Sequence, residues 1–232
     1  MYVNPDYAER ELSVLHEMIE AARFGLLVVC ADGALGAHIP FVLHREGGNG
    51  NGNGTLLGHV AGNDPLARHL GAGAQEGQEA LAIFSGPAAY VSPRWYEGDG
   101  LAAVGRAVLA GEGLAGEGLP TYNFLAVHAY GRPRLLDERE AVLAYLGELV
   151  DVHERRSPNP WSLGLASEDH VAGLLPHIVA FTFEIEAIQG KRKLSQNKTA
   201  GDRDGVIRGL RARGGDDEEA IAEEMARWRG GT

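Results

Sequence analysis

Short stretches in which apolar and polar residues alternate recur along this chain, and they constrain its fold more than any other feature. Alternation places successive side chains on opposite faces of a β-strand. The clearest stretch is 178–188, where Val179 and Phe181 would share one face and Thr182 and Glu184 the other. Because turn residues rather than helices join most of these stretches, we expect neighbouring strands to pair antiparallel.

The expected elements alternate irregularly along the chain. Strands are expected at residues 26–30, 35–44, 55–61, 79–85, 89–92, 122–136 and 178–188, and helices at 7–23, 64–70, 138–154, 168–175, 203–213 and 216–229. Gly86-Pro87 is expected to break one strand and Gly190 to turn the chain after another. A dinucleotide-binding α/β fold would need regular strand–helix alternation with a Gly-x-Gly-x-x-Gly turn, and neither is present. The pattern predicts a closed antiparallel barrel with helical additions.

Several classes of protein are excluded by simple counts. The single cysteine, Cys30, excludes an intrachain disulfide and a cysteine-rich zinc site, and we expect it to be buried. None of the nine histidines falls in a His-x-x-x-His pair, and there is no Gly-x-Ser-x-Gly motif. We therefore predict no metal site and no serine nucleophile. The start of the chain lacks a secretory pattern, and the apolar run 24–31 is far shorter than the ~20 residues of a membrane span, so we expect a cytoplasmic protein.

The chain is rich in glycine, with 33 residues, and two clusters account for much of the excess. The segment 47–54 alternates Gly and Asn and predicts a hairpin tip. It is no phosphate loop, because a Gly-Lys-Ser/Thr sequence does not follow it. The segment 97–119 is long for a connection and predicts a lid or an insertion.

Polar and aromatic residues gather at the ends of the expected strands, in the segments 38–41, 58–61, 90–96, 120–124 and 193–197. Such groups could surround one planar, phosphorylated ligand, with aromatic rings for stacking and hydroxyl or basic groups for phosphate. They could equally close the mouth of a barrel, with Asn and Ser making turns. From spacing alone the second interpretation is favoured.

Five segments taken in order carry a resemblance to a known family: HIPFVL, GHVAGNDPLAR, IFSGPAAYVSPRWY, LPTYNFLAVHAYG and GKRKLSQNK. The chain resembles the PaiB-type FMN-binding negative transcriptional regulators, of the FMN-binding split-barrel group, from Met1 to about Leu210. The resemblance implies a mainly β (α+β) fold, an antiparallel split β-barrel of about six strands with flanking helices. It also implies a homodimer with a flavin cleft at the subunit interface. Residues 1–190 would form the FMN-binding domain, and 191–232 a basic segment with helices that pack on the barrel or the dimer partner.

The same resemblance implies which residues bind FMN. They are His38, Ile39, Pro40, His59, Ala61, Ser92, Trp95, Tyr96, Thr121, Tyr122, Asn123, Lys193, Ser195, Gln196 and Asn197. No residue stands out as a general acid or base.

The chain departs from the family pattern within the segment GHVAGNDPLAR. Members usually carry Arg where this chain has Gly62, and Asp64 adds a negative charge nearby. Both changes weaken the expected binding of a phosphate dianion if this segment reaches it.

Charge bears on the regulatory function that the family name implies. The formal net charge is −11, whereas DNA affinity depends on Lys and Arg that neutralise phosphates. Basic residues are concentrated only in 191–213, where a solvated helix face is favoured over a DNA surface. We therefore expect an FMN-dependent oxidoreductase or a redox-linked regulator. The alternatives are a repressor that binds DNA directly and a degenerate member that has lost the flavin.

Overall fold

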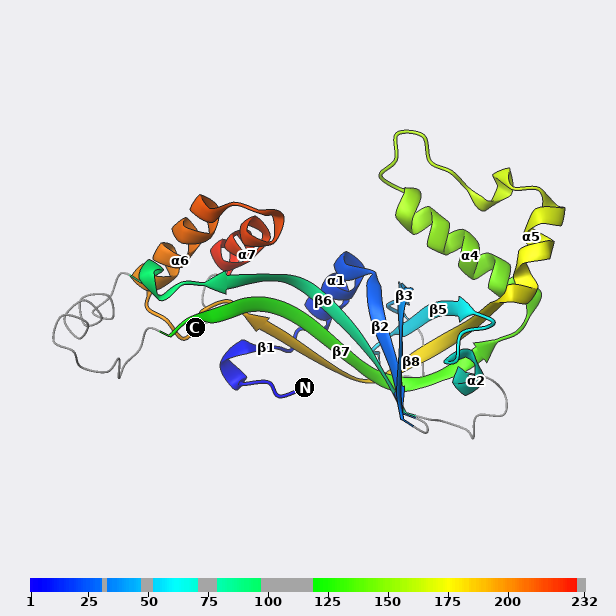
Figure 1. Cartoon of the computed structure of the whole chain (residues 1–232), viewed down its shortest axis with the longest axis horizontal. Coiled ribbons are helices and arrows are strands. Elements are labelled where there is room, and N and C mark those ends of the chain that lie inside the picture. Colours follow the sequence, from blue (N-terminus) through cyan, green and yellow to red (C-terminus); the bar gives the residue numbers. More distant parts are fainter. Residues whose placement is uncertain (31–32, 47–51, 71–78, 97–118, 229–232) are drawn as a thin grey trace. The chain divides into compact units, whose positions relative to one another are not determined.

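The computed structural model describes residues 1–30, 33–46, 52–70, 79–96 and 119–228, and an antiparallel sheet of eight strands dominates it (Figure 1). The strands are β1 (Ala8–Glu9), β2 (Phe24–Cys30), β3 (Ala34–Pro40), β4 (Val42–His44), β5 (Thr55–Ala61), β6 (Ala80–Val91), β7 (Thr121–Leu136) and β8 (Ile178–Lys193). Their order in the sheet is β3-β2-β6-β7-β8-β5-β4, and β1 pairs with β8. The sequence predicted this mainly β architecture with fewer strands.

The helices lie between and after these strands: α1 (Leu12–Ala22), α2 (Ala67–Leu70), α4 (Arg139–Glu154), α5 (Glu168–Leu174), α6 (Ala200–Arg213) and α7 (Asp216–Arg227). Short 3-10 turns are η1 (Pro5–Tyr7), η2 (Pro93–Trp95), η3 (Leu163–Leu165) and η4 (Leu175–His177). Within the described part of the chain, every helix is too short or too polar to cross a bilayer.

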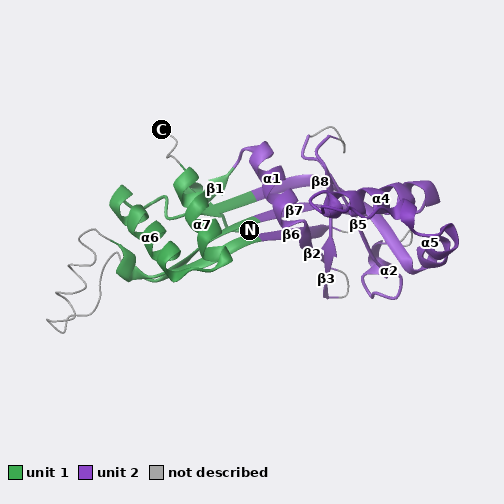
Figure 2. Cartoon of the chain, turned by 90° about the horizontal axis from the view of Figure 1, so that it is seen from above, with its two compact units in different colours: residues 1–9, 86–126, 190–232 green, residues 10–85, 127–189 purple. Residues whose placement is uncertain are grey.

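The chain divides into two compact units, coloured separately in Figure 2. Unit 1 comprises residues 1–9, 86–126 and 190–232, and unit 2 comprises residues 10–85 and 127–189. The strands β6, β7 and β8 each contribute residues to both units.

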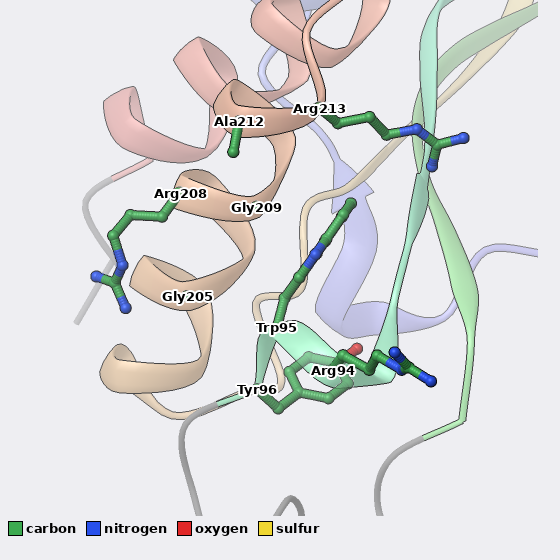
Figure 3. A pocket seen from close by; sticks show the side chains of 8 residues that line it. All are labelled: Arg94, Trp95, Tyr96, Gly205, Arg208, Gly209, Ala212 and Arg213. Carbon is green, nitrogen blue, oxygen red and sulfur yellow. The ribbon is translucent and has the colours of Figure 1, made fainter.

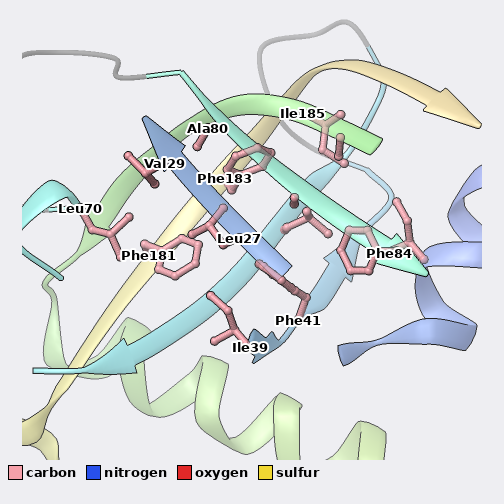
Figure 4. Packing of buried hydrophobic residues seen from close by; sticks show 14 of the residues in the cluster. Leu27, Val29, Ile39, Phe41, Leu70, Ala80, Phe84, Phe181, Phe183 and Ile185 are labelled. Atoms are coloured by element: carbon pink, nitrogen blue, oxygen red, sulfur yellow. The ribbon is translucent and has the colours of Figure 1, made fainter. Parts of the chain in front are cut away.

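Unit 2 contains the larger hydrophobic core, and Phe41 marks its corner (Figure 4). Pro40 ends β3 and Val42 begins β4, while the Phe41 N–H donates to the carbonyl of Arg23 at 2.8 Å instead of to a neighbouring strand. The Phe41 ring packs edge-on against Phe84, with ring centroids 5.3 Å apart. Because one residue separates the first and last strands of the sheet order, this corner brings the two ends of the sheet together.

A second hydrophobic cluster in unit 2 joins the outer face of the sheet to α4. Leu56 and Val60 of β5 belong to the main core, whereas Leu57 packs with Val142 and Leu149 of α4. Both faces of β5 are therefore buried.

Unit 1 contains the paired helices α6 and α7, which pack against each other. Val206 and Leu210 of α6 and Ile221 and Met225 of α7 are buried. The first turn of α7, which begins at Asp216, is acidic, and its negative charges stabilise the helix through a favourable interaction with the helix dipole. The short turn η2 also packs against α6.

Two expected breaks are wrong. β6 runs through Gly86-Pro87, because its pairing with β2 covers residues 80–83 and Pro87 needs no donor to that strand. β8 runs through Gly190 to Lys193, because β1 pairs with this extension, with Glu9 opposite Gly190.

Smaller expectations also need correction. The first helix begins at Leu12 rather than at residue 7, since Asn4 caps a 3-10 turn before it. Cys30 is exposed, because it ends β2 beyond the main core. Of the two glycine clusters, residues 47–51 and 97–118 lie outside the described residues.

Candidate functional site

The residues that the sequence nominated fall into two groups, one in each unit. Unit 1 holds Ser92, Trp95, Tyr96, Thr121, Tyr122, Asn123, Lys193, Ser195, Gln196 and Asn197, and unit 2 holds His38, Ile39, Pro40, His59 and Ala61. Each group is described here by itself.

Asn123 and Ser195 form a buried polar pair in unit 1. The Asn123 side chain is fully buried, and its Nδ2 donates to Ser195 Oγ at 3.0 Å and to Met225 Sδ at 3.4 Å. The Ser195 hydroxyl donates back to Asn123 Oδ1 at 3.2 Å. Ser195 has a φ of 60°, a left-handed conformation that is uncommon for a residue other than glycine. This pair therefore fixes the turn after β8 rather than offering free polar atoms.

Lys193 and Thr121 stand side by side at the ends of β8 and β7. Lys193 Nζ donates to Thr121 Oγ1, and both side chains remain partly exposed. Burial, and after it the charge of Lys191, lowers the pKa of Lys193. Among the described residues this ammonium group bonds to a hydroxyl and no carboxylate, so it keeps donors for an anion, and the pair can bind a phosphate or another acceptor.

The neighbouring polar residues mostly shape turns. Gln196 accepts from the backbone N–H of Leu194 at 2.7 Å and donates to the carbonyl of Arg192. The Ser92 hydroxyl accepts from the N–H of Arg94 at 3.3 Å and caps η2. Asn197 is exposed. Of these residues, Asn197 is the one whose side chain is most open to a ligand.

A pocket of about 940 Å³ lies between η2 and α6 (Figure 3). Its lining residues are Arg94, Trp95, Tyr96, Gly205, Arg208, Gly209, Ala212 and Arg213. The pocket therefore combines two predicted site residues, Trp95 and Tyr96, with guanidinium groups from both walls. Aromatic surface beside arginine suits a planar ligand that carries negative charge.

The aromatic rings of unit 1 differ in what they can offer. Tyr122 is 56% exposed, and its ring meets Tyr90 edge-on at 5.8 Å between centroids. Tyr96 is buried, and Lys198 Nζ lies 5.0 Å from the centre of its ring. Burial raises the pKa of the Tyr96 hydroxyl. Tyr122 therefore offers the open ring for stacking, while Tyr96 forms part of the pocket wall.

In unit 2, the predicted residues on β3 differ in exposure. His38 is exposed and stacks on Phe24, which is itself 59% exposed, with centroids 6.0 Å apart. Ile39 is buried in the main core, and Pro40 ends the strand. His38 and Phe24 thus form an exposed planar pair.

On β5, His59 makes a specific contact. Its Nδ1 lies 2.8 Å from the hydroxyl of Tyr145 on α4, and the two rings meet edge-on. Burial lowers the pKa of His59 and raises that of Tyr145, which favours the neutral form of both. Ala61 is exposed at the end of the strand, next to Gly62, whose N–H donates to the carbonyl of His177 at 2.8 Å.

Three arginines of the basic segment 191–213 pair with acids of their own unit. Arg192 pairs with Glu9 at 3.1 Å and with Glu224 at 2.6 Å. Further contacts join Arg211 to Glu219, Arg213 to Glu218, and Arg203 to the ring of Trp228. These contacts support the structural interpretation of the segment and reduce the charge available to DNA.

Sequence reasoning missed two parts of this picture. Sequence reasoning did not single out Tyr145, which lies on the apolar stripe of α4 between Val142 and Leu149. The available signal was its hydroxyl, which needs a partner when buried. Arg208 and Arg213 belonged to a basic segment, but nothing in their spacing places them around Trp95.

Comparison with protein families identifies the chain. A family model described as "Putative FMN-binding domain" matches residues 1–187. The chain belongs to this FMN-binding family. The resemblance inferred from the sequence motifs is thereby confirmed.

Two relatives match along nearly the full length of both proteins. It is 31% identical to the uncharacterized protein AN0679 of Emericella nidulans, over 96% of this chain and 95% of the relative. It is 26% identical to the protease synthase and sporulation protein PAI 2 of Bacillus subtilis, over 97% and 95%.

A solved structure supports the fold of this chain. The FAD and heme binding protein from Mycobacterium smegmatis superimposes with a TM-score of 0.55 at 15% identity, over 90% of this chain and 80% of that one. With the antiparallel eight-stranded sheet, this likeness confirms the expected fold, a mainly β split barrel with flanking helices.

Proposed function

We propose that this protein binds FMN and acts as a flavin-dependent oxidoreductase or a redox-linked regulator. The observation that carries the proposal is membership of the FMN-binding family, combined with a donor set that fits the cofactor. In unit 1, exposed Tyr122 offers a ring for stacking, Lys193 and Thr121 offer donors, and a neighbouring pocket adds aromatic and guanidinium groups.

Each group has a distinct role in this proposal. Flavin, when bound, supplies one- or two-electron transfer. Tyr122 would stack on a planar ring, and Lys193 with Thr121 would bind an acceptor oxygen. Asn123 and Ser195 would hold the turn that carries this lysine. In unit 2, His38, Ile39, Pro40, His59 and Ala61 remain the proposed contacts on β3 and β5.

We also propose a homodimer with its ligand cleft at the subunit interface. Exposed aromatic residues support it: Tyr122 in unit 1 and Phe24 in unit 2 each leave more than half of their surface open. Aromatic residues are enriched at protein interfaces. Light scattering coupled to size exclusion tests this part, and a monomer at micromolar concentration would contradict it.

The test of flavin binding starts from the purified full-length protein. We expect a flavin absorption spectrum, or an FMN-induced rise in melting temperature together with quenching of flavin fluorescence. Absence of all three signals would overturn the proposal and leave a degenerate member that has lost the ligand.

A substitution separates phosphate binding from ring binding. We expect Lys193→Gln to weaken FMN roughly tenfold or more, because a hydrogen bond to a charged group contributes about 1.5–3 kcal/mol. The affinity for riboflavin, which has no phosphate, should fall much less. Arg227→Gln on the exposed face of α7 is the matched control and should change neither affinity. Equal losses of affinity for FMN and for riboflavin would show that Lys193 does not contact the phosphate.

A further inference from the structure

The hydroxyl of Tyr145 lies in an apolar environment with one polar neighbour. Tyr145 is 2% exposed and belongs to the hydrophobic cluster that joins α4 to β4, β5 and β8. Its hydroxyl lies 2.8 Å from His59 Nδ1, the hydrogen-bond partner that the described structure gives it. Since a buried hydroxyl needs a partner, this contact satisfies Tyr145 and ties α4 to β5.

The chemistry of the two groups fixes the direction of the hydrogen bond. A neutral imidazole has one N–H donor and one unprotonated acceptor nitrogen. Burial disfavours both the imidazolium and the phenolate, so both groups are neutral. Among the described residues the Tyr145 hydroxyl has His59 Nδ1 as its hydrogen-bond partner, and its buried proton is satisfied only if it donates to this nitrogen. Tyr145 therefore donates, and the ring proton of His59 must be on Nε2.

The other side of the His59 ring is open. His59 is only partly buried, and within the described residues no side chain or backbone group hydrogen-bonds its Nε2. The ring is held both by the strand pairing of His59 with Ala180 on β8 and by edge-on packing against the Tyr145 ring. Such an arrangement presents an oriented N–H donor from β5.

We propose that Tyr145 is a positioning residue that holds His59 as a neutral Nε2–H tautomer, so that β5 presents a donor to an acceptor atom of the bound ligand. The acceptor could be a carbonyl oxygen or nitrogen of a flavin ring or a phosphate oxygen, since all accept one N–H. The ligand part of this inference rests on the proposed function, because His59 is one of the proposed flavin contacts. The tautomer itself does not depend on any ligand.

The tautomer is measured directly by long-range proton–nitrogen NMR correlation on protein labelled with 15N-histidine. The His59 signals are assigned by their loss in His59→Gln. We expect the wild-type protein to show protonated Nε2 and unprotonated Nδ1, and Tyr145→Phe to show a mixture of both tautomers. Tyr130→Phe, which removes a hydroxyl that donates instead to Gln189 Oε1 at 3.1 Å, is the matched control and should leave His59 unchanged.

Ligand binding is the second readout. We expect Tyr145→Phe to weaken FMN by about two- to tenfold, the range of one net hydrogen bond. An equal loss for riboflavin would place the acceptor on the ring, and a loss confined to FMN would place it on the phosphate. Circular dichroism and urea denaturation verify that Tyr145→Phe remains folded under the assay conditions.

The outcomes separate this inference from the proposed function. A wild-type Nδ1–H tautomer, or a tautomer that Tyr145→Phe leaves unchanged, would overturn the positioning role. Unchanged flavin affinity in a Tyr145→Phe protein whose tautomer has shifted would overturn the ligand contact. Failure of the wild-type protein to bind flavin would overturn the proposed function, while the NMR result would still decide the tautomer.

Discussion

The indole ring of Trp95 lies against Gly209 of α6, so closely that a Cβ at position 209 would stand 2.3 Å from Cδ2 of the ring (Figure 3). No side chain can enter this space without moving the ring or the helix. The absence of a side chain at Gly209 therefore sets the position of Trp95, and with it one wall of the pocket.

The first prediction concerns this contact. Gly209→Ala should lower the free energy of unfolding by about 1–3 kcal/mol, because overpacking forces the indole or the helix to move. Tryptophan fluorescence and urea denaturation measure the two effects. Gly147→Ala is the control, since nothing lies within 4 Å of a Cβ there, and it should stabilise α4 by roughly 0.4–1 kcal/mol. An unchanged emission spectrum in Gly209→Ala would argue against the close contact.

A second prediction concerns the buried pair formed by Asn123 and Ser195. Asn123→Ala should cost about 1–3 kcal/mol, because it leaves the Ser195 hydroxyl buried without its partner. The double variant Asn123→Ala/Ser195→Ala should cost less than the sum of the single variants, since the two residues interact directly. Asn197→Ala, at an exposed position of the same turn, should be nearly neutral. A double variant whose loss of stability equals the sum of the two single losses would contradict the hydrogen bonds.

A third prediction contrasts two arginines that both contact Glu224. Arg192→Gln should destabilise the protein by about 1–3 kcal/mol, because the Arg192 side chain is 18% exposed and also pairs with Glu9. Arg227→Gln should cost at most ~0.2–1 kcal/mol, because that side chain is 68% exposed. Chemical denaturation of both variants measures the two losses of stability. Comparable losses would show that the burial of the arginine does not decide its contribution.

The fourth prediction follows from two histidines whose pKa is lowered by burial, His59 and His128. Below about pH 6.5, the ordinary histidine pKa, the unfolded chain takes up protons that the folded chain does not, so stability is full above this pH and falls below it. Urea denaturation between pH 7.5 and 5.5 should record the decline, and His59→Gln should reduce its slope. The exposed substitution His170→Gln should retain the wild-type slope. A slope equal in wild type and His59→Gln would contradict the burial of a neutral imidazole.

Much of the sheet was predictable from local pattern. The alternation in 178–188 identified the core of β8, because one face of that strand had to be apolar, and the segment 55–61 was correctly expected as the strand β5. What local pattern could not supply was the partner of each strand end. β8 continues through Gly190 because β1 lies beside it, and β6 passes Pro87 because no β2 residue pairs there. Both depend on contacts between segments distant in sequence.

The sequence predicted which residues belong to the candidate site but not what each of them does. The motif resemblance nominated Asn123 and Ser195, yet only the structure shows that their side chains hydrogen-bond to each other rather than face outward. Tyr145 could not be nominated from its spacing, because an aromatic residue on an apolar helix stripe is normally core. Its importance arises from the strand that lies beneath it.

The pairing of α6 with α7 has a practical consequence for any assay of nucleic-acid binding. The acids at the start of α7 neutralise Arg211 and Arg213 at the end of α6. A chain truncated before Asp216 would lose these acids and leave both arginines of α6 without them. Retention of DNA by such a fragment would therefore be an artefact of truncation, and only the full chain can answer whether this protein acts on a promoter.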